Sequence, residues 1–549
     1  MADRLRVQTQ AGVDQDQGQG EERERGLIRD VLIIALATGV SRLFGLARDA
    51  VIADRFGASA AYDAYIIAFF IPHMLRQLLA EGALSTAFVP IYTGYLAQGR
   101  EEADRFAGSV LSLALVLFPG IVVVGALLAP FYLPFLASGF PEGKLRLTVS
   151  LTGVTMPFIG LVGLAAILMG ILNGRRRFLA PALAPVLFNL GLILGAWLIS
   201  PQFPRPIYGL AWGLLLGGTG MVLLQLMALS LRGGERLNLL FRLDLSHPGL
   251  RELGRMMLPA VIGLAGVQLN FLVDNKLASH LGDGAISSLQ YAVRLFQLPL
   301  GLFAVSISNA LLPRLAHRAA LRDLSGLAEN LRRGLLLGAF ILLPAVAGLY
   351  ALGRPTIILL FEHGRFTPTD TARTLTALNS YLVGLLPYGL VFLLTRGFYA
   401  LRDTRTPMII GLIGVAVNVA LDYALYRPLG VQGLALATSL AGVVNMALLF
   451  FALERRLGER LIRPLVGDLM KMALAAGVMG ALVALLSRRL AALSGSRFLL
   501  VALPGVIGLA IYSLFAFSRL GGFARLLWEG LFSGKDRRGH RAPPGAGQG

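Results

Sequence analysis

Long apolar segments recur from residue 28 to residue 518 and are separated by short polar loops. A helix needs about 20 predominantly apolar residues to cross a bilayer, whereas barrel strands show segments of roughly ten alternating residues. The segments here are long and unbroken, so the pattern predicts an all-α polytopic membrane protein with about 14 transmembrane helices. The predicted spans are residues 28–54, 61–95, 105–134, 145–172, 179–200, 206–231, 249–280, 285–315, 328–352, 371–400, 407–427, 431–454, 466–488 and 497–518.

Two weak internal repeats indicate how these helices are grouped. The segment Ser85–Pro90 resembles Ser308–Pro313, and a gapped similarity links Asn173–Asn189 with Ala400–Asn418. Repeated halves with a site between them are typical of transporters. We therefore predict two six-helix lobes followed by two further helices. The N-lobe covers residues 28–232, the C-lobe residues 249–456, and the appended pair residues 466–518.

The loops indicate the orientation of the chain. If the N-terminus is cytoplasmic, the arginine-rich loops at 174–178, 232–255 and 314–333 all lie on the cytoplasmic side. The positive-inside rule then predicts that both termini are cytoplasmic. The polar ends, residues 1–27 and 533–549, are predicted to be disordered, and the first lacks the pattern of a cleavable signal peptide.

Composition excludes several classes of function. The net charge is +19, but the basic residues sit mostly in loops between apolar segments, so we expect no nucleic-acid partner. The chain has no cysteine, which excludes disulfides, thiol catalysis and cysteine-ligated metals. It also lacks a phosphate-binding G-x-x-x-x-G-K-[ST] motif, so transport would draw on an ion gradient or the membrane potential.

Residues 41–90 hold charged side chains inside otherwise apolar segments. An ionised side chain near the bilayer centre costs roughly 2.5–3.5 kcal/mol, so such residues mark cavities, partners or charged substrates. In the first helix Arg42, Arg48 and Asp49 fall within an arc of about 120°. Arginines present a fork of donors that matches phosphate oxygens. The alternative is that Arg48 and Asp49 only pair locally at a helix end.

Further charges follow in the second and eighth predicted helices. Arg76 and Glu81 are five residues apart after Pro72, so each is expected to face another helix. Asp63 lies near the start of its helix, where capping explains a carboxylate as well as function does. Arg294 stands in the segment YAVRLFQLPLG, and its alternative role is an ion pair with Asp274.

A second group of polar residues is acidic. Asn270 and Asp274 are four residues apart in one predicted helix, as are Asn418 and Asp422 in another. That spacing places each pair on one helix face, and Thr438 adds a hydroxyl from the next helix. Carboxylate, amide and hydroxyl oxygens suit a hard cation such as Na⁺. Interhelical hydrogen bonding, which is common in membrane bundles, explains the pattern equally well.

The segment SRLFGLARDAVIADRFGASAAYDAYIIAFFIPHMLRQLLAEGALSTAFVPIY at 41–92 resembles the MurJ (MviN) family of lipid II flippases. YAVRLFQLPLGLFAVSISNALLPRLA at 291–316 is similarly close. The likeness covers roughly residues 28–520, and the family belongs to the multidrug, oligosaccharidyl-lipid and polysaccharide exporters. It implies a central cavity between two lobes. By motif, the residues that bind the lipid II headgroup are Arg42, Arg48, Arg76 and Arg294.

Beside these arginines, Asp49, Asp63 and Glu81 are expected to orient them or to gate the cavity. The resemblance also implies a sodium site at Asp274, Asn418, Asp422, Thr438 and the backbone carbonyl near Leu434. One departure is Gln77, which stands where many relatives have a second arginine. Helices 466–518 would form a hydrophobic groove for the lipid tail.

These observations predict a lipid II flippase of the bacterial inner membrane that works by alternating access and is not an enzyme. Expected partners are lipid II, membrane lipids and the cell-wall synthesis machinery, and the protein is expected to be a monomer with Na⁺ as the coupling ion. Alternatives are an exporter of another polyprenyl-linked oligosaccharide and a multidrug or cation antiporter. A membrane enzyme would need a polar cluster, for which Glu362, His363 and Asp370 are the candidates.

Overall fold

The computed structural model describes residues 36–77, 84–230, 244–493 and 495–519 of the chain. Within these residues the regular structure is helical and strands are absent. The two predicted disordered ends lie outside the described residues, as does Glu81.

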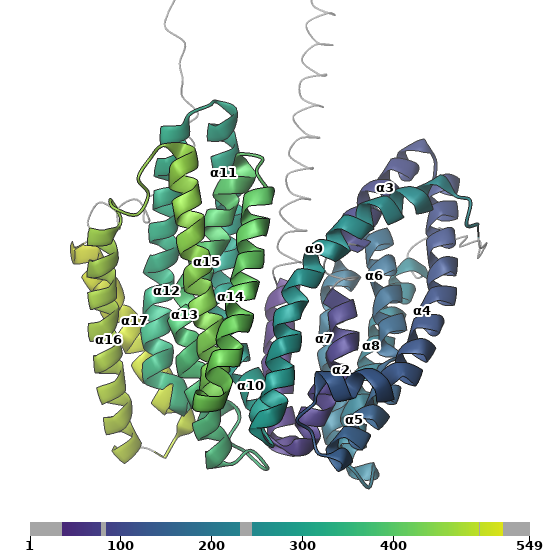
Figure 1. Ribbon diagram of the computed structural model, residues 1–549, viewed down its shortest axis with the longest axis horizontal. Helices are drawn as coiled ribbons and strands as arrows, with labels where there is room; N and C mark the ends of the chain where they lie inside the picture. The colour runs from purple at the N-terminus through teal and green to yellow at the C-terminus, as the bar shows by residue number, and fades with distance from the viewer. Residues whose placement is uncertain (1–35, 78–83, 231–243, 494, 520–549) are drawn as a thin grey trace, which may run out of the picture. The chain divides into compact units, whose positions relative to one another are not determined.

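Helices follow one another along the whole described chain (Figure 1). The first described helix covers residues 36–56. The others are α2 (Ala60–Arg76), α3 (Leu84–Gln98), α4 (Arg100–Leu136), α5 (Glu142–Thr155), α6 (Phe158–Gly174), α7 (Leu179–Leu194), α8 (Ile207–Ser230), α9 (Pro248–Ala278), α10 (Ala285–Pro299), α11 (Val305–Ala320), α12 (Leu324–Leu360), α13 (Pro368–Ala400), α14 (Arg405–Leu429), α15 (Val431–Leu457), α16 (Val466–Leu493) and α17 (Arg497–Arg519).

Eleven helical segments within the described residues are long and apolar enough to cross a membrane. This confirms the predicted class, an all-α multi-pass membrane protein. The predicted total of about 14 spans stays a prediction. Several spans are interrupted: Pro157 lies between α5 and α6, and π-helical turns at Gly195–Ile199 and Leu300–Ala304 follow α7 and α10. Such breaks free backbone groups and redirect the helix axis.

The chain forms two compact units. The first contains residues 1–297, 357–384 and 405–445, and the second contains residues 298–356, 385–404 and 446–549. The boundaries between the two units fall inside several of the helices. The predicted division into an N-lobe at 28–232, a C-lobe at 249–456 and an appended pair stays a prediction.

In the first unit, α7 and α8 approach each other through glycines. A Cβ placed on Gly191 would lie 2.3 Å from the backbone of Gly217, and one on Gly195 would lie 2.5 Å from that of Gly213. Small residues at this four-residue spacing let membrane helices meet at backbone contact. The close contact fixes the side chains that α7 and α8 present to their neighbours.

In the second unit, α16 and α17 pack on α12. Met479 and Val483 of α16 form a buried cluster with Tyr512 of α17 and Leu352 of α12. Many other side chains of this helix pair are exposed, including Leu474, Leu485 and Val506. Apolar exposure of this kind is expected for helices that face lipid.

Candidate functional site

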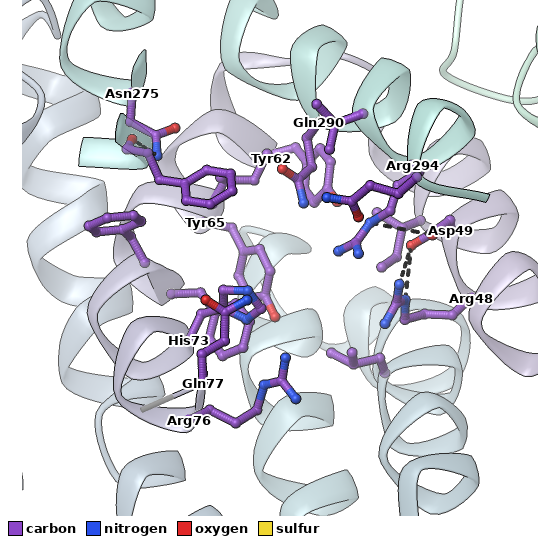
Figure 2. Close-up of a pocket in the computed structure, with 18 of the residues that line it drawn as sticks. Arg48, Asp49, Tyr62, Tyr65, His73, Arg76, Gln77, Asn275, Gln290 and Arg294 are labelled. Atoms are coloured by element: carbon purple, nitrogen blue, oxygen red, sulfur yellow. Dashed lines mark hydrogen bonds and ion pairs between the residues drawn. The ribbon is translucent and has the colours of Figure 1, made fainter. Parts of the chain in front are cut away.

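A cavity of about 410 Å³ lies in the first unit, among the first helix, α2, α7, α9 and α10. Figure 2 shows that its labelled side chains are mostly polar and converge from helices far apart in the sequence. Three predicted headgroup residues, Arg48, Arg76 and Arg294, line this cavity together with Asp49. The structure therefore brings together the charges that the sequence shows in separate segments.

Arg48 is held in one orientation by two neighbours. Its Nε and Nη2 atoms donate to Oδ1 of Asp49 at 2.9 and 2.6 Å, and its Nη1 donates to Oδ1 of Asn189 at 2.9 Å. Asn189 in turn donates to the backbone carbonyl of Ser41, which ties α7 to the first helix. Because both sides of the guanidinium are engaged, the group is preorganised at the cavity wall.

Arg294 reaches the same carboxylate from α10. Its Nε lies 3.7 Å from Oδ2 of Asp49, the oxygen that Arg48 leaves open (Figure 2). Asp49 therefore lies between two arginines, and its role in orienting them stays a prediction. The alternative partner for Arg294, Asp274, lies instead in a separate polar cluster with Asp422.

Arg76 completes the cationic lining from α2. It follows His73 by three residues, and both side chains line the cavity. The adjacent Gln77 accepts a hydrogen bond of 2.7 Å from Nε2 of Gln268 on α9. At the position where the family resemblance leads us to expect a second arginine, this chain therefore has an amide that joins α2 to α9.

Arg42 is placed differently from the other predicted headgroup arginines. It is exposed, and it is not one of the residues that line the cavity. It lies nearly two turns before Arg48 on the same helix, so the shared helix face does not bring it to the same depth. Its role in headgroup binding stays a prediction.

Asp63 is fully buried and holds the start of α10 and the residue before it against α2. Its Oδ2 accepts hydrogen bonds from Lys144 Nζ at 2.9 Å and from the Gly284 amide at 2.8 Å. Its Oδ1 accepts from the backbone and hydroxyl of Ser287 at 2.9 and 2.7 Å. Lys144 also reaches Asp283 at 2.8 Å. Among the predicted roles of Asp63, these contacts fit gating.

The acidic residues form a second site between α9 and α14. Asn418 Nδ2 donates to Oδ2 of Asp422 at 3.0 Å, and the carboxyl groups of Asp274 and Asp422 lie within hydrogen-bonding reach. One side-chain oxygen of each of these three residues is buried without a hydrogen-bond partner. The structure therefore brings together the two helix faces that the sequence patterns predict.

The remaining predicted cation ligands lie on α15. Thr438 Oγ1 donates to the carbonyl of the buried Leu434 at 3.2 Å. Among the described residues, no group of three or more His, Cys, Asp or Glu side chains is placed to hold a metal. A cation at this location would therefore depend on two carboxylates supplemented by amide, hydroxyl and carbonyl oxygens.

The polar cluster considered for an enzyme has local structural partners. Thr371 donates to Glu362 at 2.6 Å, and Asp370 accepts from the Thr367 amide at 2.9 Å. Both acids therefore stabilise the start of α13.

Sequence reasoning missed several residues that shape the cavity. Asn189 fixes Arg48, and Gln268 fixes Gln77, although neither belongs to a recognisable motif. The available signal was an isolated amide side chain within an otherwise apolar helix. Such an amide usually has a hydrogen-bond partner on another helix. Lys144 lies between the predicted spans 105–134 and 145–172, although its side chain is buried against Asp63.

Comparisons with known proteins agree with one another. The family model for the lipid II flippase MurJ matches residues 52–504. A probable lipid II flippase MurJ from Vibrio cholerae is 35% identical over 502 residues, covering 89% of this chain and 95% of the relative. A solved lipid II flippase MurJ in an inward closed conformation has 29% identity and a TM-score of 0.76, covering 90% of this chain and 99% of its own.

A more distant similarity concerns the fold alone. An inward-facing multidrug resistance transporter of the MATE family, within the MOP superfamily, matches with a TM-score of 0.65 at 17% identity. The match covers 78% of this chain and 98% of that transporter.

Proposed function

Because the chain belongs to the MurJ family of lipid II flippases, we propose that it moves lipid II from the cytoplasmic to the periplasmic leaflet. The observation that carries the proposal is the set Arg48, Arg76 and Arg294 around one cavity, where Asp49 is the acidic side chain among the described lining residues. Three arginines and one aspartate leave an excess of positive charge. Guanidinium groups bind pyrophosphate oxygens through paired hydrogen bonds, so the cavity matches an anionic headgroup.

The rest of the lining suits the sugar part of such a headgroup. Asn275, Gln290 and Gln297 offer amide donors and acceptors for hydroxyl groups. Tyr62 and Tyr65 add aromatic surface beside them. The undecaprenyl tail would stay in the membrane while the headgroup crosses through the cavity.

Translocation by alternating access requires that the contacts around Asp63 form in one state and break in another. The carboxylate is buried with Lys144 and is bound by two backbone amides and a hydroxyl from the segment 284–287. Opening this side of the cavity would expose the ion pair to water, and hydration of the two charges would offset part of the energy of the lost contacts. The Asp63 cluster therefore serves as the gate on the side opposite the arginine-rich loops.

The residues around Asp274 fit a sodium ion as the coupling ion. Unpaired buried oxygens on Asp274, Asn418 and Asp422 supply the hard ligands that such an ion prefers. Thr438 and the Leu434 carbonyl would add further oxygens from α15. Bound Na⁺ supplies positive charge between two adjacent carboxylates. It shifts the conformational equilibrium only if the two states differ in their affinity for it.

Several further features belong to the same proposal. The protein resides in the bacterial inner membrane with both termini cytoplasmic, acts as a monomer beside the cell-wall synthesis machinery, and carries out no covalent chemistry. Six-helix lobes at 28–232 and 249–456 would rock about the cavity. Helices α16 and α17 would guide the lipid tail along their exposed apolar side chains.

The experiment that tests this function is complementation of a strain depleted of its own lipid II flippase. We expect the intact chain to restore growth and Arg294→Ala to fail at equal membrane expression. Arg488→Ala, at an exposed position on α16, is the matched control and should grow like the intact chain. Failure of the well-expressed intact chain would contradict the proposed function.

A further inference from the structure

A second cavity, of about 140 Å³, lies among α2, α6, α7 and α8. We call it the side pocket and define it by its lining. The lining residues are Arg76, Val162, Ala165, Ala166, Met169, Pro181, Ala184, Pro185, Phe188, Met221 and Gln225. Arg76 and Phe188 also line the arginine cavity, so the two spaces adjoin at these side chains. A group attached to a headgroup in the arginine cavity would enter the side pocket by passing these two side chains.

Two polar residues stand in this otherwise apolar lining. Gln225 has only 1% of its surface exposed, and its Oε1 is buried without a hydrogen-bond partner. A buried amide oxygen that lacks a partner destabilises the fold unless something donates to it. A water molecule in a cavity needs two to four polar partners, and the described part of this lining offers two, Gln225 and the guanidinium of Arg76. A ligand group with an N–H donor meets the need of Gln225 as well.

The size and chemistry of the pocket define that group. A cavity of about 150 Å³ accommodates a molecule such as benzene, so the side pocket holds a group of a few heavy atoms. Gln225 accepts one hydrogen bond and Arg76 donates others, which matches the N–H and the carbonyl of a secondary amide. The small side chains Ala165, Ala166 and Ala184 leave room for a methyl group beside it.

We infer that the side pocket binds a methyl-bearing secondary amide of the lipid-linked headgroup, and that Gln225 thereby contributes to substrate specificity. This inference rests on the proposed function. Peptidoglycan precursors carry two groups of this chemistry, the acetamido groups of the amino sugars and the alanyl amides of the stem peptide. Both combine an N–H, a carbonyl and a methyl group, and both are attached beyond the pyrophosphate.

The test compares two ligands on the purified full-length chain: lipid II, and undecaprenyl pyrophosphate, which has no amide. Gln225→Leu should weaken lipid II binding by about tenfold, because one hydrogen bond to a buried amide is lost. It should leave the affinity for undecaprenyl pyrophosphate unchanged. Ala165→Leu, which fills the pocket, should also weaken lipid II binding and leave undecaprenyl pyrophosphate binding unchanged. Gln202→Leu and Ala416→Leu, at exposed positions, are the matched controls.

Thermal unfolding separates a binding role from a structural one. Replacing an unpaired buried amide by an apolar group of similar shape should leave the midpoint of Gln225→Leu equal to or above that of the wild type. A clearly lower midpoint with unchanged ligand preference would mean that Gln225 supports the fold alone, which overturns the inference.

Two lipid II analogues distinguish the source of the amide. If the acetamido group occupies the pocket, removal of the N-acetyl groups abolishes the difference between wild type and Gln225→Leu. If an alanyl amide occupies it, removal of the stem peptide does so. If wild type and Gln225→Leu still differ in affinity for both analogues, the inference is overturned. It is also overturned if Ala165→Leu loses co-purified phospholipid while its affinity for lipid II stays unchanged. If the wild type fails to bind lipid II at all, the proposed function itself fails.

Discussion

Arg294 places its Nε 3.7 Å from Oδ2 of Asp49, and the other oxygen of that carboxylate binds Arg48. One aspartate therefore positions arginines from two helices that are far apart in the sequence. If the cavity binds the headgroup as proposed, the same carboxylate competes with the incoming pyrophosphate for both guanidinium groups. Its presence sets a limit on how tightly the cavity can hold an anion.

Removal of this competition should change affinity and turnover in opposite directions. We expect Asp49→Asn to bind undecaprenyl pyrophosphate about three- to tenfold more tightly, because charge-assisted hydrogen bonds are freed for the phosphate. Lipid II translocation should become slower, since release is hindered. Binding titration and a translocation assay on the same preparation measure the two effects. Weaker binding by Asp49→Asn would show that the carboxylate mainly preorganises the arginines.

The Asp63–Lys144 ion pair should contribute to the free energy of unfolding. Lys144→Met leaves the buried Asp63 carboxylate without its cation, which typically costs about 3–5 kcal/mol of unfolding free energy. The double variant Asp63→Asn/Lys144→Met should recover part of that loss. Thermal unfolding in detergent measures both. Arg146→Met, at an exposed position on the same helix as Lys144, should have little effect.

A close contact between α7 and α8 gives a prediction with a matched control on the same helix pair. Gly191→Ala would place a methyl group 2.3 Å from the Gly217 backbone, whereas Gly220→Ala would place one 3.5 Å from Leu187. We expect Gly191→Ala to lower the unfolding free energy by about 1–3 kcal/mol and Gly220→Ala to be nearly neutral. Equal unfolding midpoints for the two variants would mean that α7 and α8 can move apart without a loss of unfolding free energy.

The sodium site predicts ion-dependent stability. A ligand present at 100 times its dissociation constant stabilises the folded state by about 2.7 kcal/mol. Addition of Na⁺ should therefore raise the unfolding midpoint of the wild type more than K⁺ does. Asp422→Asn should remove the difference, and Asp468→Asn, on α16, should retain it. A sodium effect that persists in Asp422→Asn would place the ion elsewhere.

Helical class and the chemistry of the cavity could be predicted from sequence, because apolar length and buried charge are local signals. The meeting of Arg48 with Arg294 could not be derived from spacing alone, since it depends on how distant helices pack. It was expected only from the family resemblance. Arg42 illustrates the limit of helical periodicity, which gives the direction of a side chain around the axis but not its depth.

Other residues were hidden because their partners are distant in sequence. Lys144 lies between two predicted spans, and only the folded chain places it against Asp63. Gln225 stands alone in an apolar helix, and its importance appears only when the side pocket and its unpaired oxygen are seen together. Isolated polar residues in apolar helices were therefore the most informative signal left unused.

The most direct test of the central claim measures lipid II translocation in liposomes that contain the purified chain. We expect the wild type and Arg488→Ala to move lipid II across the bilayer, and Arg294→Ala to be reduced to the rate of protein-free liposomes. Excess soluble pyrophosphate should slow the wild type. Translocation by Arg294→Ala at the wild-type rate, in correctly folded protein, would contradict the claim that the arginine cavity carries the headgroup.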